Sequence, residues 1–166
     1  MILYHGSNVY IDSIELQRCK PYKDFGRGFY CTTIKSQAEL MAKRVAIIFG
    51  GKPSVTQFEL DESIFADADI NIKKFEGATE DWAIFVLNNR NRHFTQIDNR
   101  GCNHDNKYDI VIGPIADDDL ALLFRTFTSG LIDLKTLTKG LKYKVLTNQY
   151  SFHTDRALKY LKPMGV

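Results

Sequence analysis

Two glycines separated by one residue stand directly before an aromatic, β-branched run, and this arrangement constrains the fold most. The segment reads Lys23-Asp24-Phe25-Gly26-Arg27-Gly28-Phe29-Tyr30-Cys31-Thr32-Thr33. Glycine permits unusual backbone angles and close approach to the main chain, and the residues after it favour an extended strand. The segment therefore predicts a strand over residues 28–33, whose entry lets backbone approach a ligand and whose Tyr30 lies beside that ligand.

Length and composition favour one domain, which we expect to span residues 1–166. Hydrophobic residues make up 44% of the chain and aromatic residues 12%, enough for a packed core. The net charge of +2, with both signs scattered, gives no case for a dedicated nucleic-acid binder, although a nucleic acid can still be a substrate.

Cysteine usage and hydropathy bear on location. The three cysteines include no C-x-x-C pair, so a disulfide framework is not expected and a reducing, cytoplasmic location is favoured. The first residues do not resemble a signal peptide. The longest apolar run, residues 45–49, is far shorter than a membrane span, so we expect no membrane association.

The pattern of periodicities and breakers predicts a mixed order of strands and helices. Strands are expected at 2–5, 28–33, 54–60, 108–114 and 145–154, and helices from 36 to the Gly50-Gly51 pair and at 80–91, 117–128, 133–141 and 155–161. Ser36 with Glu39 resembles a capping box, and Thr79 an N-cap. Residues 61–75 fit a strand or a turn. This order favours an α+β fold over a doubly wound sheet.

Several polar residues have both a functional and an ordinary interpretation. His5, followed by Gly6 and Ser7 at a strand end, places an imidazole and free backbone groups at the edge of a site, or is a surface histidine before a turn. Gln149, Ser151 and His153 share one face of the last strand, which is often the wet side of an antiparallel sheet. None of these residues alone indicates a functional site; only their combination does.

The sequence gives little evidence for a metal site or a catalytic thiol. Cys102-Asn103-His104 has no second ligand pair at metal spacing. Asp117-Asp118-Asp119 is explained better as the acidic first turn of a helix than as a cation site. A nucleophilic Cys–His pair built on Cys31 or Cys102 is open in principle, because such partners need only meet in space. We therefore expect no metal.

In combination, the motifs resemble the NAD site of ADP-ribosyltransferases. His5-Gly6-Ser7, then Phe25-Gly26-Arg27-Gly28-Phe29-Tyr30, then Ser36-Gln37-Ala38 opening a helix, are similar to the diphtheria-toxin and poly(ADP-ribose) polymerase branch, whose site is written His-Tyr-Glu. The whole chain looks like an uncharacterised bacterial family of that superfamily, through Asp24 to Tyr30, Asn89-Arg90, the 108–114 run with Ala116-Asp117-Asp118, and Gln149 to Thr154.

The resemblance implies a split α+β fold of two packed, mostly antiparallel sheets, with helices around a central cleft that holds NAD as substrate. By position, His5 would hydrogen-bond the adenine-side ribose, and Gly6 would hold the nicotinamide amide through its backbone. Ser7 would add a hydroxyl contact, and Gly28 would shape the cleft wall. Tyr30 would stack on the nicotinamide ring, with Ala38 packed below it.

The chain departs from that family at the third position, where Gln149 stands in place of the catalytic glutamate. The glutamate of the family bonds the nicotinamide ribose 2-hydroxyl and favours the oxocarbenium-like transition state. Glutamine can still accept that hydrogen bond, but it offers no charge and cannot act as a general base. His5, Tyr30 and Gln149 are thus the expected catalytic residues, with His153 as a candidate helper.

The expected activity is NAD-dependent mono-ADP-ribosylation, a glycosyltransferase reaction, of a protein or nucleic-acid acceptor. A bacterial toxin restrained by an antitoxin protein is the cellular role that the resemblance suggests. Two alternatives remain open: an NAD glycohydrolase that simply consumes NAD, and a non-catalytic NAD-binding or protein-interaction module with the same fold.

Overall fold

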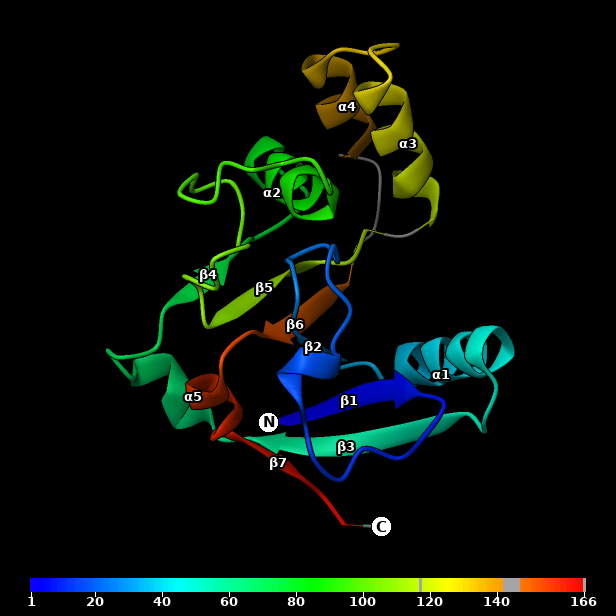
Figure 1. The fold of residues 1–166 in the computed structure, drawn as a ribbon, viewed down its shortest axis with the longest axis vertical. Helices are drawn as coiled ribbons and strands as arrows, with labels where there is room; N and C mark the ends of the chain where they lie inside the picture. Colours follow the sequence, from blue (N-terminus) through cyan, green and yellow to red (C-terminus); the bar gives the residue numbers. More distant parts are fainter. Residues whose placement is uncertain (117, 142–146, 166) are drawn as a thin grey trace.

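One mixed sheet of seven strands organises the protein, in the order β4-β5-β6-β2-β1-β3-β7 (Figure 1). The computed structural model describes residues 1–116, 118–141 and 147–165. Strands β4 and β5 run parallel, and the other neighbouring pairs run antiparallel. The strands are β1 (Ile2–Ser7), β2 (Phe29–Thr32), β3 (Ser54–Leu60), β4 (Ile72–Lys74), β5 (Ile110–Pro114), β6 (Asn148–Phe152) and β7 (Leu161–Pro163).

Each face of this sheet has its own apolar core, one with residues of α2, α3 and α4 and the other with residues of the short elements α5 and η2. Helices α2, α3 and α4 lie over the β4-β5-β6 half, and α1 lies beside β1 (Figure 1). The helices are α1 (Lys35–Phe49), α2 (Glu80–Arg90), α3 (Asp118–Thr128), α4 (Leu134–Leu141) and α5 (Asp155–Leu158), with short 3-10 turns η1 (Leu16–Arg18) and η2 (Glu62–Ala66).

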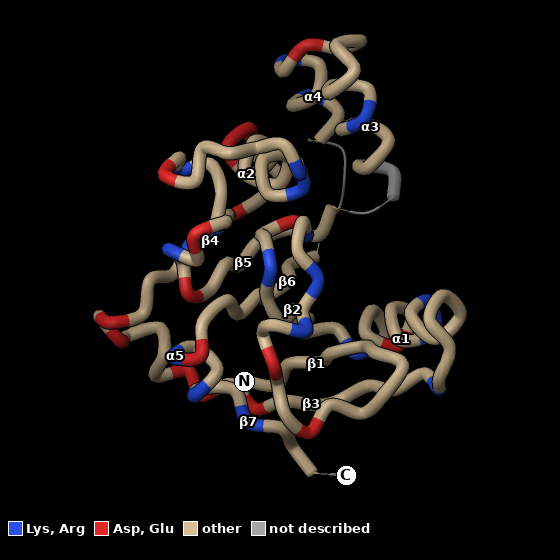
Figure 2. The backbone as a smooth tube through the Cα atoms, viewed as in Figure 1, with Lys and Arg blue, Asp and Glu red and all other residues tan. Residues whose placement is uncertain are grey.

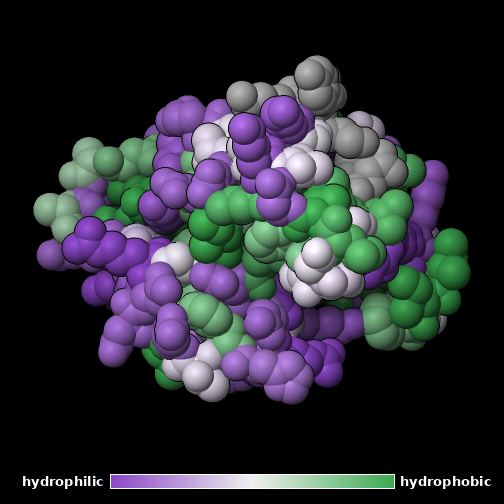
Figure 3. Space-filling model, turned by 90° about the horizontal axis from the view of Figure 1, so that it is seen from above, coloured by the Kyte–Doolittle hydropathy of each residue, from purple (hydrophilic) through white to green (hydrophobic). Residues whose placement is uncertain are grey.

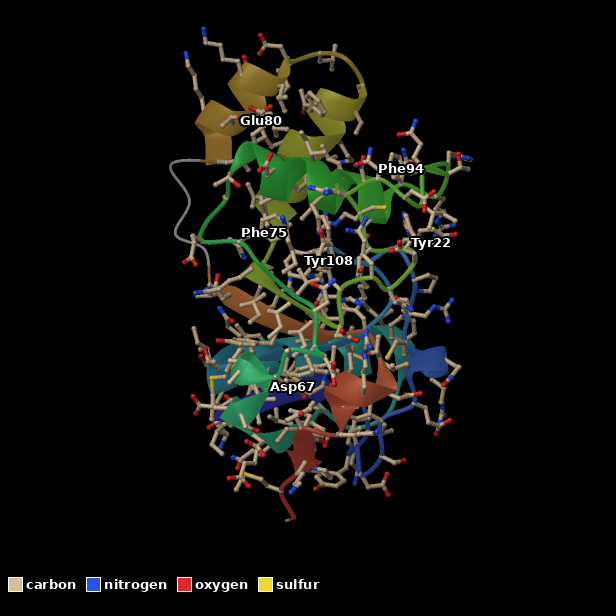
Figure 4. All side chains as sticks on the ribbon, turned by 90° about the vertical axis from the view of Figure 1, so that its left-hand side faces the viewer. Tyr22, Asp67, Phe75, Glu80, Phe94 and Tyr108 are labelled. Carbon is tan, nitrogen blue, oxygen red and sulfur yellow. The ribbon has the colours of Figure 1, made fainter. Side chains whose placement is uncertain are left out.

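Strand β5 shows why the 108–114 run is apolar at every position. Ile110 and Ile112 join the core that contains Phe29 and Phe152, whereas Val111 joins the core beneath α2. Side chains alternate between the two faces of a strand, so a strand buried on both faces needs continuous apolar residues. Figure 4 shows Phe75 and Tyr108 between α2 and the sheet, in this second core. The predicted buried strand is confirmed.

The expected α+β class is confirmed, but the described strands form one sheet rather than two. That sheet consists of two halves, β4-β5-β6-β2 and β1-β3-β7. Strands β1 and β3 pair from Ile2↔Glu59 to Ser7↔Ser54, whereas β1 and β2 pair only at Tyr4↔Thr32. Within the described residues, the backbone ladder between the two halves therefore consists of a single residue pair; we call the rest of this β1–β2 boundary, where no ladder pair forms, the open boundary.

Two local predictions need correction. Helix α1 begins at Lys35 after Ile34, without a side-chain cap, so Ser36 is not the N-cap. The reason is that Thr32 already accepts a hydrogen bond from the Ile34 amide and starts the turn earlier. The last helix ends at Leu158 and is followed by β7, a strand that the sequence pattern did not indicate.

Other boundaries agree closely with the sequence. Thr79 caps α2, accepting a hydrogen bond from the Trp82 amide at 3.3 Å. Residues 61–75 contain η2 and β4. Asp117 and residues 145–146, predicted to begin a helix and the last strand, lie outside the described residues. No helix in the described ranges is long and apolar enough to cross a bilayer.

Helix α1 keeps apolar side chains on its outer surface. Figure 3 shows green, apolar residues at the right-hand edge, where α1 lies in Figure 1. The exposed apolar residues of this helix are Leu40, Met41, Ile47, Ile48 and Phe49.

Candidate active site

Along the open boundary, backbone N–H and C=O groups of β1 point toward β2. Within the described residues, these groups have no partner in a β1–β2 ladder. Met1 and Leu60 exchange both backbone hydrogen bonds, at 2.8 and 2.9 Å, which fixes the direction of each residue in β1. Because alternate residues of an antiparallel strand bond to opposite neighbours, the N–H and C=O of Gly6 point toward β2. The β1–β2 ladder has already ended at Tyr4↔Thr32, so Gly6 presents a donor and an acceptor to the open boundary.

His5 bridges this boundary with its side chain. Its Nδ1 lies 2.7 Å from the carbonyl oxygen of Tyr30, and its ring stacks on Phe29 with centroids 4.3 Å apart. Burial lowers the pKa of His5, with a smaller contribution in the same direction from Lys23, against the raising effect of the carbonyl. A carbonyl only accepts, so Nδ1 carries the proton in the neutral ring and Nε2 is left as an acceptor.

Gly6 also lies in close contact with α1. A Cβ atom at Gly6 would overlap the carbonyl oxygen of Ala38 and lie 2.9 Å from the amide nitrogen of Ala42. Ala38 and Ala42 are the buried residues of α1. The small residues Gly6 and Ala38 therefore allow the helix to lie directly against β1, one residue from His5.

Tyr30 is anchored by its hydroxyl while its ring stays partly exposed. The hydroxyl donates to the carbonyl of Gly26 at 2.7 Å and accepts from the amide of Phe25 at 3.0 Å. Burial raises the pKa of Tyr30 well above its ordinary value, and Asp24 adds to this effect, so the group remains protonated. Gly26 has a φ of +93°, a conformation that glycine adopts without strain, so the turn that receives the hydroxyl depends on it.

Gly28 makes room for His153, which is buried behind it. A Cβ atom at Gly28 would lie 2.7 Å from Nδ1 of His153. That nitrogen lies 2.8 Å from the carbonyl oxygen of Arg27, and Nε2 lies 2.8 Å from the hydroxyl oxygen of Ser151. Burial lowers the pKa of His153 to about 4, so the ring is neutral at pH 7. His153 therefore supports the backbone at Arg27 and Gly28, and both of its ring nitrogens have protein partners.

Gln149 lies next to β2 and is tied to a carboxylate rather than free. It pairs with Thr32 across β2 and β6 and is buried. Its Nε2 donates to Oδ2 of Asp24 at 3.0 Å and lies 3.5 Å from the carbonyl oxygen of Pro114. The expected third site residue thus has an acidic partner that comes from the glycine-rich segment.

Asp24 is the centre of a buried polar cluster. Its Oδ1 accepts from Nε and Nη2 of Arg90, at 2.9 and 2.6 Å, and its Oδ2 accepts from the Ala116 amide at 3.2 Å as well as from Gln149. Asp24 is only 9% exposed. A buried carboxylate is stable when it is paired and its lone pairs are filled, as they are here. The cluster joins the glycine-rich segment, the end of α2, the segment after β5, and β6.

The sequence interpretation missed the roles of Asp24 and Arg90. In the sequence, Asp24 and Arg90 stand only among the motifs that carry the resemblance, with no role assigned to either. The signal that could have found them is an acidic residue directly before the buried Phe25, because a carboxylate there requires a cationic partner. Nothing in the spacing of 24 and 90 identifies that partner.

The remaining candidates lie as follows. Ser7 donates weakly to Asn8, with an oxygen–oxygen distance of 3.4 Å, and stays partly exposed at the end of β1. Cys31 is buried, and burial raises the pKa of its thiol well above the ordinary value.

Within the described ranges, no three His, Cys, Asp or Glu side chains gather as metal ligands would. An open hollow of about 640 Å³ is lined by residues 95–99 and includes none of the site residues.

Several lysine and arginine residues lie in the segment that leads into β2. Figure 2 shows lysine and arginine positions along the segment that precedes β2, which includes Arg18, Lys20, Lys23 and Arg27. Lys23 is close enough to His5 to lower its pKa. The boundary between β1 and β2 is therefore bordered by cations on the side of the glycine-rich segment.

Comparison with known proteins identifies a family and no characterised relative. Residues 1–162 match the family described as "Protein of unknown function (DUF3990)". No curated protein and no solved structure matches the chain.

Proposed function

The chain belongs to the DUF3990 family, whose function is unknown, and we propose from its site that it is an NAD-dependent mono-ADP-ribosyltransferase. One observation carries the proposal: the β1–β2 ladder stops at Tyr4↔Thr32, next to Gly6 and the partly exposed ring of Tyr30. A central strand with main-chain groups directed at an open boundary is unusual, because buried N–H and C=O groups are normally paired.

The chemistry of nicotinamide fits these groups. Its carboxamide has one donor group and one acceptor, which complement the C=O and N–H of Gly6. Its flat ring can stack on Tyr30, whose hydroxyl is already held by the turn at Gly26. Nε2 of His5, the acceptor nitrogen, would receive a ribose hydroxyl. Lys23 and the neighbouring cations would attract the diphosphate of NAD.

The proposed reaction transfers ADP-ribose to a protein or nucleic-acid acceptor. The bond between ribose C1′ and the nicotinamide nitrogen breaks, and the pyridinium nitrogen takes the bonding electron pair, so nicotinamide leaves neutral. A lone pair of the acceptor forms the new bond to C1′, and the acceptor's proton goes to a base or to water. Gln149 would stabilise the ribose by a neutral hydrogen bond, about half as strong as a charge-assisted one. We therefore expect slow transfer of single units.

The decisive experiment incubates the protein with labelled NAD in a bacterial lysate, followed by separate nuclease and protease treatment. Label that survives one treatment and not the other identifies the acceptor class. Tyr30→Ala should abolish labelling, whereas Tyr10→Ala, which removes an exposed tyrosine outside the proposed site, should not. No label at any enzyme concentration would refute the transferase.

A non-catalytic NAD-binding module is the second candidate, and the uncharged side chain at position 149 favours it. A glutamine brings no charge of its own to the ribose. This candidate predicts NAD binding by calorimetry, with neither labelled acceptor nor released nicotinamide. Nicotinamide released at full rate without label would instead indicate an NAD glycohydrolase.

A further inference from the structure

We propose that Asp24 is a positioning residue that turns the amide of Gln149 so that its carbonyl oxygen, and not its NH2 group, faces the nicotinamide ribose. The inference rests on the proposed function, and it assigns a role to a residue outside the His5, Tyr30 and Gln149 set. Its basis is the chemistry of the groups around Nε2 of Gln149.

The orientation of the Gln149 amide follows from its neighbours. Oδ2 of Asp24, at 3.0 Å, and the carbonyl oxygen of Pro114, at 3.5 Å, both lie near the same end of the amide. Both are acceptors, so only the NH2 group can occupy that end. Because the amide is planar, Oε1 lies on the side away from Asp24. Gln149 thus has one orientation, with an acceptor oxygen directed away from the polar cluster.

The carboxylate that imposes this orientation is itself rigid. Arg90 bonds its Oδ1 through two nitrogens, and the backbone amide of Ala116 bonds its Oδ2. Arg90 also donates to the carbonyl of Ala116 at 3.2 Å, which connects the two supports. A side chain fixed by paired hydrogen bonds can hold a neighbouring group within the narrow range that catalysis requires.

This orientation makes Oε1 of Gln149 a hydrogen-bond acceptor on the side away from Asp24. A free glutamine would present NH2 and oxygen with similar ease, and only the oxygen can accept the ribose hydroxyl. The hydrogen bond from NH2 to a carboxylate also polarises the amide, which makes Oε1 a better acceptor. Asp24 therefore contributes through Gln149 without touching the substrate.

Asp24→Asn tests the inference most directly. The asparagine amide would present its NH2 to Gln149, so the Gln149 amide would rotate and offer Oε1 to residue 24. We expect the kcat for nicotinamide release to fall about 100-fold, the scale of a misplaced catalytic group. The Kd for NAD should stay within about 3-fold, since Tyr30 and Gly6 are unchanged. Gln149→Ala should match that loss, and the double variant should lose no more, because both changes remove one interaction.

Asp109→Asn is the matched control for stability. Asp109 is another buried aspartate bonded to an arginine, Arg156, and it is not part of the Gln149 cluster. Its replacement should lower the melting temperature about as much as Asp24→Asn does, with kcat unchanged. A fall in kcat equal to that of Asp24→Asn would overturn the inference, because the effect would then be general destabilisation.

A measurement independent of turnover distinguishes the two proposals. The side-chain amide resonance of Gln149, assigned by its loss in Gln149→Ala, should be protected from hydrogen exchange in the wild type and lose that protection in Asp24→Asn. Unchanged protection would refute the positioning role even if the enzyme is active. NAD turnover equal in wild type and Asp24→Asn would also refute it, while leaving the proposed function intact. Failure of the wild type to bind NAD would refute both the function and the role toward ribose.

Discussion

Replacing the buried amide by a carboxylate, with Gln149→Glu, should destabilise the protein in a pH-dependent way. A carboxylate oxygen in place of Nε2 would lie near 3.0 Å from Oδ2 of Asp24. At that distance, and at an effective dielectric constant of about 20, two unit charges repel by about 5 kcal/mol. Arg90 offsets part of this repulsion through its bonds to Asp24. Proton uptake by the new pair relieves the rest.

The sign of the pH dependence follows from the protonation of the introduced glutamate. The neighbouring Asp24 raises the pKa of this new carboxyl group in the folded state above its ordinary value of about 4.3. The folded state then binds more protons than the unfolded state between these two pKa values, so stability falls as pH rises through that interval. A shift of two to three pKa units costs about 3 to 4 kcal/mol at pH 8. Below about pH 4, the introduced carboxyl group is protonated and donates to Asp24, so the cost disappears.

Urea denaturation from about pH 4.5 to pH 8, the interval over which the new carboxyl group loses its proton, measures this effect, with Gln149→Met as the control. Methionine removes the hydrogen bond to Asp24 without adding charge, so its stability loss should be the same at every pH. The difference between the Glu and Met variants should grow steadily with pH. Adding Asp24→Asn to Gln149→Glu should recover most of the loss at the alkaline end. Parallel pH profiles for the two single variants would refute the assigned contact between Gln149 and Asp24.

Three further predictions concern the support of the site. Tyr30→Phe removes the anchor of the partly exposed ring, so the free energy of unfolding should drop by about 1 to 3 kcal/mol; an unchanged urea midpoint would contradict the two hydrogen bonds of its hydroxyl. Gly6→Ala places a methyl group against the carbonyl of Ala38, so α1 must shift, with a loss of about 1 to 3 kcal/mol and of NAD binding measured by calorimetry. Burial lowers the pKa of His153 from 6.5 to about 4, so between these pH values the unfolded state binds a proton that the folded state does not. The free energy of unfolding should therefore fall by about 3 kcal/mol as pH drops from 6.5 to 4. His153→Gln should reduce that slope and leave the part that comes from His5, whose pKa burial also lowers; a wild-type stability curve that is flat over the interval would show that the ring is not buried neutral.

The sequence predicted the parts of the site that depend on local pattern. The glycine pair before an aromatic strand predicted β2, the continuous apolar run predicted a strand buried on both faces, and Thr79 predicted the start of α2. These features are set by residues close in sequence, through backbone freedom, side-chain alternation and capping.

What the sequence did not predict depends on contacts between distant residues. The Asp24–Arg90 pair spans 66 positions, and the Gln149–Asp24 hydrogen bond spans 125. Strand β7 is a three-residue segment that becomes a strand only by pairing with β3. Each partner alone has an ordinary surface interpretation, and only the tertiary fold gives it another. The relation to ADP-ribosyltransferases and the roles of His5 and Tyr30 toward NAD stay predictions.

Because β1 and β2 share a single ladder pair, the backbone amides of β1 should differ in their rates of hydrogen exchange. The amides of Leu3, His5 and Ser7 bond to β3, and the amide of Tyr4 is paired with β2, so all four should exchange slowly with deuterated water. Gly6 lies among them in the same central strand, yet its amide should exchange like that of an edge strand. A ligand that bonds Gly6 would slow that one amide, so a single resonance can report occupancy of the boundary before any product is detected.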